Sequence, residues 1–423
     1  MSTAPSLLSQ LIADISKKGT ILEDYLTRNG LPQPSFKTSA PIDLAIPASE
    51  ESLIVGPAEG LKWIGMTEIY LLTSLQILCH FNIAQSIPLG SPIAFNELAK
   101  KTSLNESLLA HYLHMASTHH YFYEPAPGFA AHTAGSRLLA EDEGYRACAW
   151  LRADIFFTAC SKALETMTRF GGSAKPEEAP YAVAFGDVFF AHLEKEPWRR
   201  EKFAHSMKAM TSGSEVEEIA VVYDWGSVEE GGLVVDIGGG MAHISAAIAT
   251  AHPHLHFLIQ DLPSLADQAN THIASRSGPK ASHLTFHPHD FFTPQPAIAR
   301  NAAVYVLRNI LHDWSDAHCQ QILAHIVDAM GPKSRVVIVD VVVPEPGTLG
   351  MYEEAQMRTL DLTMWALFAA RERSMEDWEG LLKVVDERLG VLKVVEPPRM
   401  RRYAVMEVGL LGEGVGGMEA RPI

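Results

Sequence analysis

The chain has 423 residues, enough for two domains with separate cores, and 47% of them are hydrophobic and 20% charged, as in ordinary globular proteins. Its net charge of −16 argues against nucleic acid as a partner, because phosphate backbones require a basic surface. The N-terminus lacks the pattern of a secretory signal, and no apolar run approaches the ~20 residues that would span a membrane. Four scattered cysteines indicate reduced thiols, so we expect a cytoplasmic protein.

Residues 1–57 are expected to form a helical arm and an extended connector. Leucine and isoleucine recur at helical spacing within residues 1–30. Five prolines follow between Pro32 and Pro57, which favours an extended segment.

Residues 58–165 are expected to form a winged-helix domain. The segments 93–102 and 104–120 predict a helix–turn–helix pair, and 121–133 predicts the wing hairpin. The second helix carries Glu106 and neither Lys nor Arg, whereas a helix that reads DNA needs basic or amide side chains. A packing or dimerisation role is therefore favoured.

Residues 166–423 are expected to hold a helical connector followed by an α/β domain. Aromatic side chains are frequent between residues 141 and 222, and at helical spacing they favour a packed core over a ligand site. From Leu233 onward strands and helices alternate, which predicts a doubly wound, mostly parallel sheet. The expected strands are 233–237, 255–260, 284–287, 302–307 and 335–343, with a closing hairpin over 391–398 and 401–411.

The segment LVVDIGGGMAHIS, residues 233–245, gives the strongest indication of ligand binding. Its strand ends on Asp236, and three glycines precede a helix: Gly238, Gly239 and Gly240. Glycines at such a turn let the backbone approach a ligand, and the helix N-terminus offers free N–H groups. The next strand ends on Asp261, where an acidic side chain can bind the two hydroxyls of a ribose, and we assign Leu262 after it to the cofactor-binding set as well. The pattern predicts a nucleoside-containing cofactor.

Polar residues also follow the later strands, at the edge where ligands of such sheets bind. Asp290 and Phe291 follow the third strand and suit the edge and the face of an adenine. Arg308 and Asn309 follow the fourth strand, where we assign Arg308 to the cofactor-binding set. Both side chains could instead cap a helix or form salt bridges.

His312 is the candidate general base, because an imidazole titrates near ~6.5 and can accept a proton at neutral pH. Asp340 and Glu372 could orient the ring through its second nitrogen. The sequence leaves open whether the three meet, and His312 could instead be a helix-start histidine bound by backbone.

Histidines also cluster in HPHLH and HPHD, at residues 252–256 and 287–290. No Cys, Asp or Glu accompanies them at the spacing of metal ligands. Solvated histidines at strand ends are favoured, and no metal is expected.

The motifs VVDIGGG, FLIQDLP, HDFF, VYVLRNILHDWSD, VVIVDVVVP and RERSMEDW occur in this order after DLAIPASEESL, ELAKKTSLNE and FYEPAPGFAAHTAGSRLLA. With them the chain resembles the S-adenosylmethionine-dependent O-methyltransferases of the plant caffeate/flavonoid type over roughly residues 40–410. It is most similar to fungal, sterigmatocystin-type members that methylate phenolic polyketides. The resemblance implies a Rossmann-like class I methyltransferase domain, an N-terminal winged-helix dimerisation domain and a homodimer, with S-adenosylmethionine as cofactor.

The resemblance also implies roles for single residues. The loop glycines would hold the cofactor, with Asp261 on its ribose and Asp290 near its adenine. His312 matches the family's general base, flanked by Glu372 and by Asp340, where the family commonly has Glu. Two methionines match positions that line the acceptor pocket, Met207 and Met364. The base would deprotonate an aromatic or enolic hydroxyl, for which a phenol pKa lies near ~10, while the methyl group moves in line.

Three other hypotheses remain. Ala242 stands where the family's loop usually has glycine, and this drift leaves room for a methyltransferase-like pericyclase or dehydratase that binds S-adenosylmethionine without transferring methyl. In such a protein His132, Arg308 and Asn309 would bind the substrate carbonyl, although His132 could simply pack in the wing. A nicotinamide dehydrogenase is opposed by the missing G-x-G-x-x-G spacing, and a DNA-binding or regulatory dimer by the acidic second helix.

Overall fold

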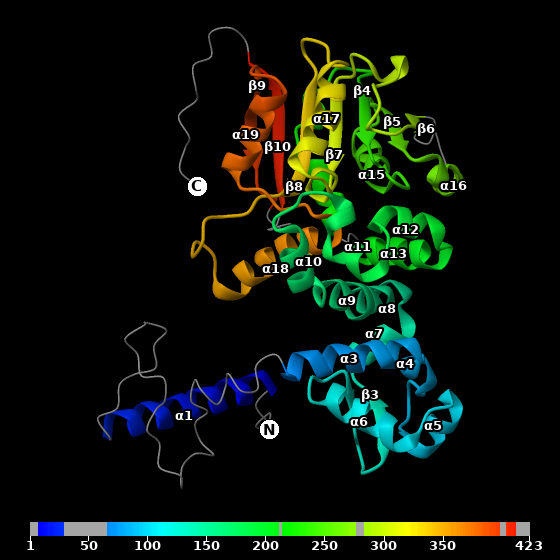
Figure 1. Ribbon diagram of the computed structural model, residues 1–423, viewed down its shortest axis with the longest axis vertical. Coiled ribbons are helices and arrows are strands. Elements are labelled where there is room, and N and C mark those ends of the chain that lie inside the picture. The colour runs from blue at the N-terminus through cyan, green and yellow to red at the C-terminus, as the bar shows by residue number, and fades with distance from the viewer. Residues whose placement is uncertain (1–6, 29–65, 211–213, 276–282, 398–402, 412–423) are drawn as a thin grey trace, which may run out of the picture.

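The computed structural model describes residues 7–28, 66–210, 214–275, 283–397 and 403–411. The predicted arm contains helix α1 (Leu7–Arg28), whereas the predicted connector between Pro32 and Pro57 lies outside the described residues. Along the long axis of the molecule, a helical bundle lies between an N-terminal region at one end and a sheet domain at the other (Figure 1).

The N-terminal region contains the predicted helix–turn–helix pair and wing. The Asn105 side chain caps α6 by accepting from the Leu108 N–H at 3.0 Å, and Leu98, Leu109 and Leu113 pack into one core. The strands form a small antiparallel sheet in the order β1-β3-β2. Its elements are α3 (Met66–His80), α4 (Ile83–Ser86), β1 (Ile93–Ala94), α5 (Phe95–Thr102), α6 (Glu106–Ser117), β2 (Phe122–Tyr123), β3 (Phe129–His132) and α7 (Ala134–Glu141).

The central bundle is built from short helices, as the aromatic-rich segment predicts. A π-helical turn over Leu151–Phe156 joins the first two helices, and Pro180 and Pro197 begin two of the later ones, as favoured at a helix N-terminus. The helices are α8 (Glu143–Trp150), α9 (Phe157–Cys160), α10 (Ala163–Phe170), α11 (Pro180–Phe185), α12 (Phe189–Lys195), α13 (Pro197–Met210) and α14 (Ser214–Val222).

The sheet domain has seven strands in the order β6-β5-β4-β7-β8-β10-β9. The first five of these are parallel, and β10 runs antiparallel to both of its neighbours. This confirms the predicted Rossmann-like fold and closing hairpin, with the bounds of the five parallel strands shifted by at most two residues. The strands are β4 (Leu233–Ile237), β5 (His256–Asp261), β6 (Leu284–Pro288), β7 (Val304–Arg308), β8 (Arg335–Val341), β9 (Leu389–Val395) and β10 (Tyr403–Leu410).

Helices cover both faces of this sheet, which explains why its strands are apolar without alternation. Val234 packs with Ile219 of α14 and Ala246 of α15, whereas its neighbour Val235 packs with Ile322 of α17 and Trp378 of α19 on the other face. The remaining helices of the domain are α15 (His243–Ala251), α16 (Ala266–Ala274), α17 (Asp316–Val327), α18 (Met351–Phe368) and α19 (Met375–Val385).

Two further features bear on the sequence expectations. All four cysteines lie in described segments, and each is a free thiol. Within the described ranges, no helix combines the length and the apolar character that crossing a membrane requires.

Candidate active site

Loops that follow two of the parallel strands are hydrogen-bonded to the neighbouring strands at the carboxyl edge of the sheet. The N–H of Gly239, after β4, donates to the carbonyl of Gln260 in β5 at 3.1 Å. The N–H of Asn309, after β7, donates to the carbonyl of Val339 in β8 at 3.1 Å. These bonds bring the predicted strand-end residues to one edge.

The backbone of the glycine turn adopts conformations that residues with a side chain rarely adopt. Gly238 and Gly240 adopt φ values of +69° and +55°, in the left-handed region. A Cβ at Gly238 would lie 2.4 Å from the Ile310 side chain, and one at Gly239 would lie 2.6 Å from the Asp236 carboxylate. Nothing lies within 4 Å of a Cβ at Gly240, so the loop leaves open space there.

Two strand-end carboxylates hold this loop. Asp236 is buried and accepts from the Ser245 hydroxyl at 2.5 Å, and burial raises its pKa to about 6. Asp261 accepts from the N–H of Gly240 at 2.9 Å and from that of Leu262 at 2.7 Å, while burial raises its pKa. Asp236 therefore packs beneath the loop, and Asp261 lies beside its third glycine.

Ala242 follows the same turn and departs from the glycine expected there. It is fully buried and adopts φ +64°, at the N-cap of α15. The left-handed conformation costs a non-glycine residue roughly 1–2 kcal/mol, which the surrounding fold must offset. The alanine therefore preserves the shape of the turn at a cost in strain.

The loop after β6 reaches the glycine turn. The Asp290 carboxylate accepts from the N–H of Phe292 at 2.9 Å. The Phe291 ring lies 3.8 Å from the position of a Cβ at Gly238, and it meets Trp314 edge-on with centroids 5.9 Å apart. The predicted adenine-binding segment and the glycine turn thus border the same space.

Arg308 and Asn309 both contact Tyr403 of β10. The Arg308 guanidinium lies 5.9 Å from the centre of the Tyr403 ring, and the Asn309 amide donates to the Tyr403 hydroxyl at 3.3 Å. Asn309 adopts φ +52°, so the chain turns sharply as it leaves β7. This turn directs the following residues toward β8.

His312 lies among three carboxylates from different parts of the chain. Its Nδ1 is 3.1 Å from Glu372 Oε1 and 3.4 Å from Asp340 Oδ1, and its Nε2 is 3.6 Å from Asp313 Oδ1. Since both partners of Nδ1 are acceptors, Nδ1 carries the hydrogen, which leaves Nε2 with the lone pair of a neutral ring. The donor atoms of His312, Asp340 and Glu372 lie within 4.8 Å of one another, a spacing that would also suit a metal ion.

Burial and charge compete in this cluster. Burial lowers the pKa of His312, but Asp340, Asp313 and Glu372 outweigh it and raise that pKa well above 6.5. Burial raises the pKa of Asp313 to about 7 and that of Asp340 to about 6, although the imidazole lowers both. The three carboxylates therefore favour the protonated form of the ring, and burial opposes them.

An aromatic cluster from the bundle and α18 borders the turn of His312. Phe190 stacks on Phe368 with centroids 5.3 Å apart and on Trp314 with centroids 6.0 Å apart. Met364 belongs to this cluster and Met207 packs against it. The two methionines predicted to line an acceptor pocket are thus brought to one apolar surface beside the histidine.

Comparison with known proteins decides the family. Residues 163–385 match the O-methyltransferase domain family, and the chain is 33% identical over 440 residues to the O-methyltransferase aurJ of Gibberella zeae, covering 96% of this chain and 98% of that protein. The chain belongs to this O-methyltransferase family. Its cofactor is S-adenosylmethionine, and it acts on a small molecule.

Solved structures share the fold of this O-methyltransferase. Mitomycin 7-O-methyltransferase MmcR superposes with a TM-score of 0.73 at 24% identity, over 84% of this chain and 98% of that chain. A structure described as a pericyclic reaction enzyme superposes with a TM-score of 0.69 at 22% identity, over 86% and 92%. The same fold therefore occurs in proteins with different reactions.

One predicted site residue of the methyltransferase lies apart from the others within the chain. His132 is in the wing, where its Nδ1 is 2.9 Å from the Ser136 hydroxyl and its Nε2 is 3.2 Å from the Ile87 carbonyl. Both ring nitrogens thus have partners within the N-terminal region, as wing packing requires.

Two residues near the site were missed by sequence reasoning as members of it. Arg373 directly follows Glu372, so adjacency to a candidate residue was an available signal. Phe190 is one aromatic residue among many in the bundle, and no sequence pattern separates it from the rest.

The glycine turn generates a test. Gly238→Ala should raise the Kd for S-adenosylmethionine at least about tenfold, or 1.4 kcal/mol, because a methyl group strains a left-handed residue and displaces Ile310. Gly231→Ala is the matched control, since Gly231 has φ +73° with nothing within 4 Å of a Cβ. Isothermal titration calorimetry on both variants measures the difference, and equal affinities in the two would contradict the assignment.

Proposed function

We propose that this methyltransferase methylates a phenolic or enolic hydroxyl of an aromatic, polyketide-type secondary metabolite, with His312 as the general base. The observation that carries the proposal is the contact of the His312 Nδ1 with Glu372 and Asp340 beside a stacked aromatic surface. This contact orients the ring and leaves Nε2 to accept a proton.

The residues at the glycine turn fit S-adenosylmethionine. Gly240 leaves open space, the Asp261 carboxylate lies next to it, and α15 begins three residues later, so the positive end of its helix dipole faces this turn. Phe291 offers an apolar ring on the same side of the turn, next to Gly238. When bound, the cofactor supplies an electrophilic methyl group on a positively charged sulfur.

The protein's own part in the reaction is to orient the acceptor and move a proton. Neutral His312 would accept the hydroxyl proton at Nε2, which would prepare the oxygen for the methyl group that the bound cofactor supplies. Glu372 and Asp340 stabilise the imidazolium that results. A cation placed near His312 disfavours its protonated form, so a bound cofactor counteracts the carboxylates that raise its pKa.

The aromatic cluster supports a flat acceptor. Phe190 is nearly parallel to both Phe368 and Trp314, with interplanar angles of 13° and 21°. Such faces favour offset stacking with a planar ring. Trp314 is two residues from His312, so a ring held on this surface would present its hydroxyl near the base.

A product analysis tests the proposed base. His312→Ala should lower kcat by about 10²–10⁴-fold while the Kd for the cofactor stays within about twofold, because proton transfer is lost and cofactor contacts remain. Mass spectrometry with isotopically labelled cofactor and a panel of phenolic acceptors measures methyl transfer, and His111→Ala, on the exposed face of α6, is the control. Wild-type activity in His312→Ala would contradict the role, and conversion without a change of mass would favour the pericyclase or dehydratase.

The pH dependence tests the carboxylates. The pKa of His312 is raised above its usual 6.5, and the base must be neutral to accept a proton. A plot of kcat/KM for the acceptor against pH should therefore have an acidic limb, a region in which kcat/KM rises with pH, centred above pH 6.5. Asp340→Asn removes one of the charges that raise this pKa, so its limb should move to lower pH. Asp386→Asn, at a surface ion pair with Arg388, should leave the limb in place. A limb that does not move in Asp340→Asn would contradict the proposed coupling.

We also propose that the protein is a cytoplasmic homodimer. Large apolar side chains are exposed on α10 and α18, two helices that both pack against α11, at Leu164, Met167, Met351, Tyr352 and Leu362. A second copy would remove this surface from water. The free thiols of all four cysteines support the location.

Light scattering after size-exclusion chromatography tests the dimer. The double variant Leu164→Glu/Met167→Glu should be monomeric, because it places charges in the proposed interface. Val384→Glu substitutes an exposed apolar residue of α19 and should remain dimeric. A monomeric wild type would overturn this part of the proposal.

A further inference from the structure

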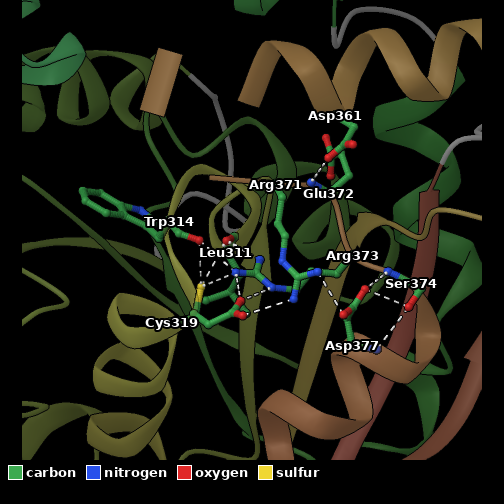
Figure 2. Close-up of polar contacts among 10 residues, drawn as sticks. Leu311, Trp314, Cys319, Asp361, Arg371, Glu372, Arg373, Ser374 and Asp377 are labelled. Atoms are coloured by element: carbon green, nitrogen blue, oxygen red, sulfur yellow. Dashed lines mark hydrogen bonds and ion pairs between the residues drawn. The ribbon is translucent and has the colours of Figure 1, made fainter. Parts of the chain in front are cut away.

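Arg373 is a fully buried cation next to the site, between α18 and α19. Its guanidinium donates to the carbonyl of Leu311 at 2.8 Å and to that of Trp314 at 2.9 Å. It also donates twice to the Asp316 carboxylate, at 2.9 and 2.7 Å, and lies 5.2 Å from the centre of the Trp378 ring. Figure 2 shows the bonds to Leu311 and Trp314 converging on the guanidinium.

The two carbonyls that Arg373 binds lie on either side of His312 along the chain. Leu311 immediately precedes His312, and Trp314 follows Asp313. One side chain therefore holds both ends of the four-residue turn that carries the imidazole. A planar guanidinium can do this because its donors point in several fixed directions at once.

The same short segment also holds the partner of the base. Glu372 precedes Arg373, and its backbone N–H donates to the Asp361 carboxylate of α18 at 3.0 Å (Figure 2). On the other side, the Arg373 carbonyl accepts from the N–H of Val343, just after β8, at 2.9 Å. The backbone of this segment is thus fixed from two directions.

Adjacency links these contacts. Glu372 binds the ring of His312, while Arg373 binds the backbone on both sides of that ring. A shift of the turn relative to Glu372 would have to break bonds to Arg373. The distance between His312 Nδ1 and Glu372 Oε1 is therefore set by two consecutive residues.

We propose that Arg373 is a positioning residue for catalysis, which fixes the His312 turn against Glu372 so that the ring is oriented before substrate binds. This inference rests on the proposed role of His312 as the base. Arg373 acts through the backbone of Leu311 and Trp314, whose carbonyls accept its hydrogen bonds.

The guanidinium of Arg373 is costly to bury, so general stabilisation of the fold is a poor explanation for it and a specific role is favoured. Burying a guanidinium requires desolvation, which apolar packing avoids. Its carboxylate partner Asp316 keeps a side-chain exposure of 45%, so the ion pair is only partly removed from water. The positive charge of Arg373 also lowers the pKa of Asp340. Arg373 therefore acts electrostatically on one of the carboxylates that contact His312.

Arg371 provides a matched comparison two residues away. It pairs with the same Asp316 at 3.1 Å and with Asp377 at 2.9 Å, but its side chain is 47% exposed. Within the described part of the chain, its ion pairs are with carboxylates outside the His312 turn. Both arginines thus form an ion pair with Asp316. Arg373 also binds the backbone of the His312 turn.

The experiment compares Arg373→Lys with Arg371→Gln in the full-length protein. Lysine keeps the charge but cannot bind both carbonyls and the carboxylate in one plane. We expect Arg373→Lys to lower kcat by about 10–100-fold, with the Kd for S-adenosylmethionine and the thermal midpoint close to wild type. Arg371→Gln should keep kcat within about twofold of wild type, since the turn is untouched.

The pH profile provides the readout that a purely structural role would not change. Asp313, Asp340 and Glu372 face His312, and a looser turn weakens their attraction for the imidazolium. The acidic limb of kcat/KM should therefore move to lower pH in Arg373→Lys. If that variant fails to fold, Asp316→Asn, at a partly exposed partner, should show the same shift with a smaller loss of kcat.

The outcomes separate this inference from the proposed function. Wild-type kcat and an unmoved limb in Arg373→Lys would overturn the positioning role. Loss of cofactor affinity and thermal stability in parallel with kcat, without a shift of the limb, would overturn it as well. Wild-type activity in His312→Ala would instead contradict the proposed role of His312 as the base, and the positioning role of Arg373 would fail with it.

Discussion

The contact of an imidazole with the carboxylates around it is the interaction on which this site depends. Each carboxylate taken from water is costly alone, and two of them, Asp340 and Glu372, are almost completely buried. His312 offsets this cost by placing its Nδ1 hydrogen between them. Because the three residues come from a strand, a turn and an interhelical segment, their loops must hold a fixed relation to the sheet.

Two sets of backbone contacts hold these loops in place relative to the sheet. At the cofactor edge, glycine at 238 and 239 is required because any side chain would meet Ile310 or the Asp236 carboxylate. At the base, Arg373 binds the turn whose ring is bound by the preceding residue. In both places the geometry comes from backbone contacts close to the reactive groups, so the site is formed before ligands arrive.

The site also lies where two parts of the chain meet. The sheet domain contributes the glycine turn and His312, whereas the helical bundle contributes Phe190, which stacks on Trp314. This arrangement places an apolar, aromatic surface beside a strongly polar cluster. Under the proposed function, the bundle would govern which acceptor fits and the sheet edge would govern the chemistry, as expected where one fold serves different substrates.

The parallel sheet, its closing hairpin and the glycine turn after β4 could be predicted from the residues alone, because apolar runs and glycines encode local structure directly. The packed structure was needed to show that His312 meets Glu372, 60 residues away, and that His132 stays in the wing. It also revealed Arg373 beneath the turn, which sequence reasoning left unassigned. The physical reason is that local propensity acts over a few residues, whereas contacts between distant segments arise only when the helices and strands pack.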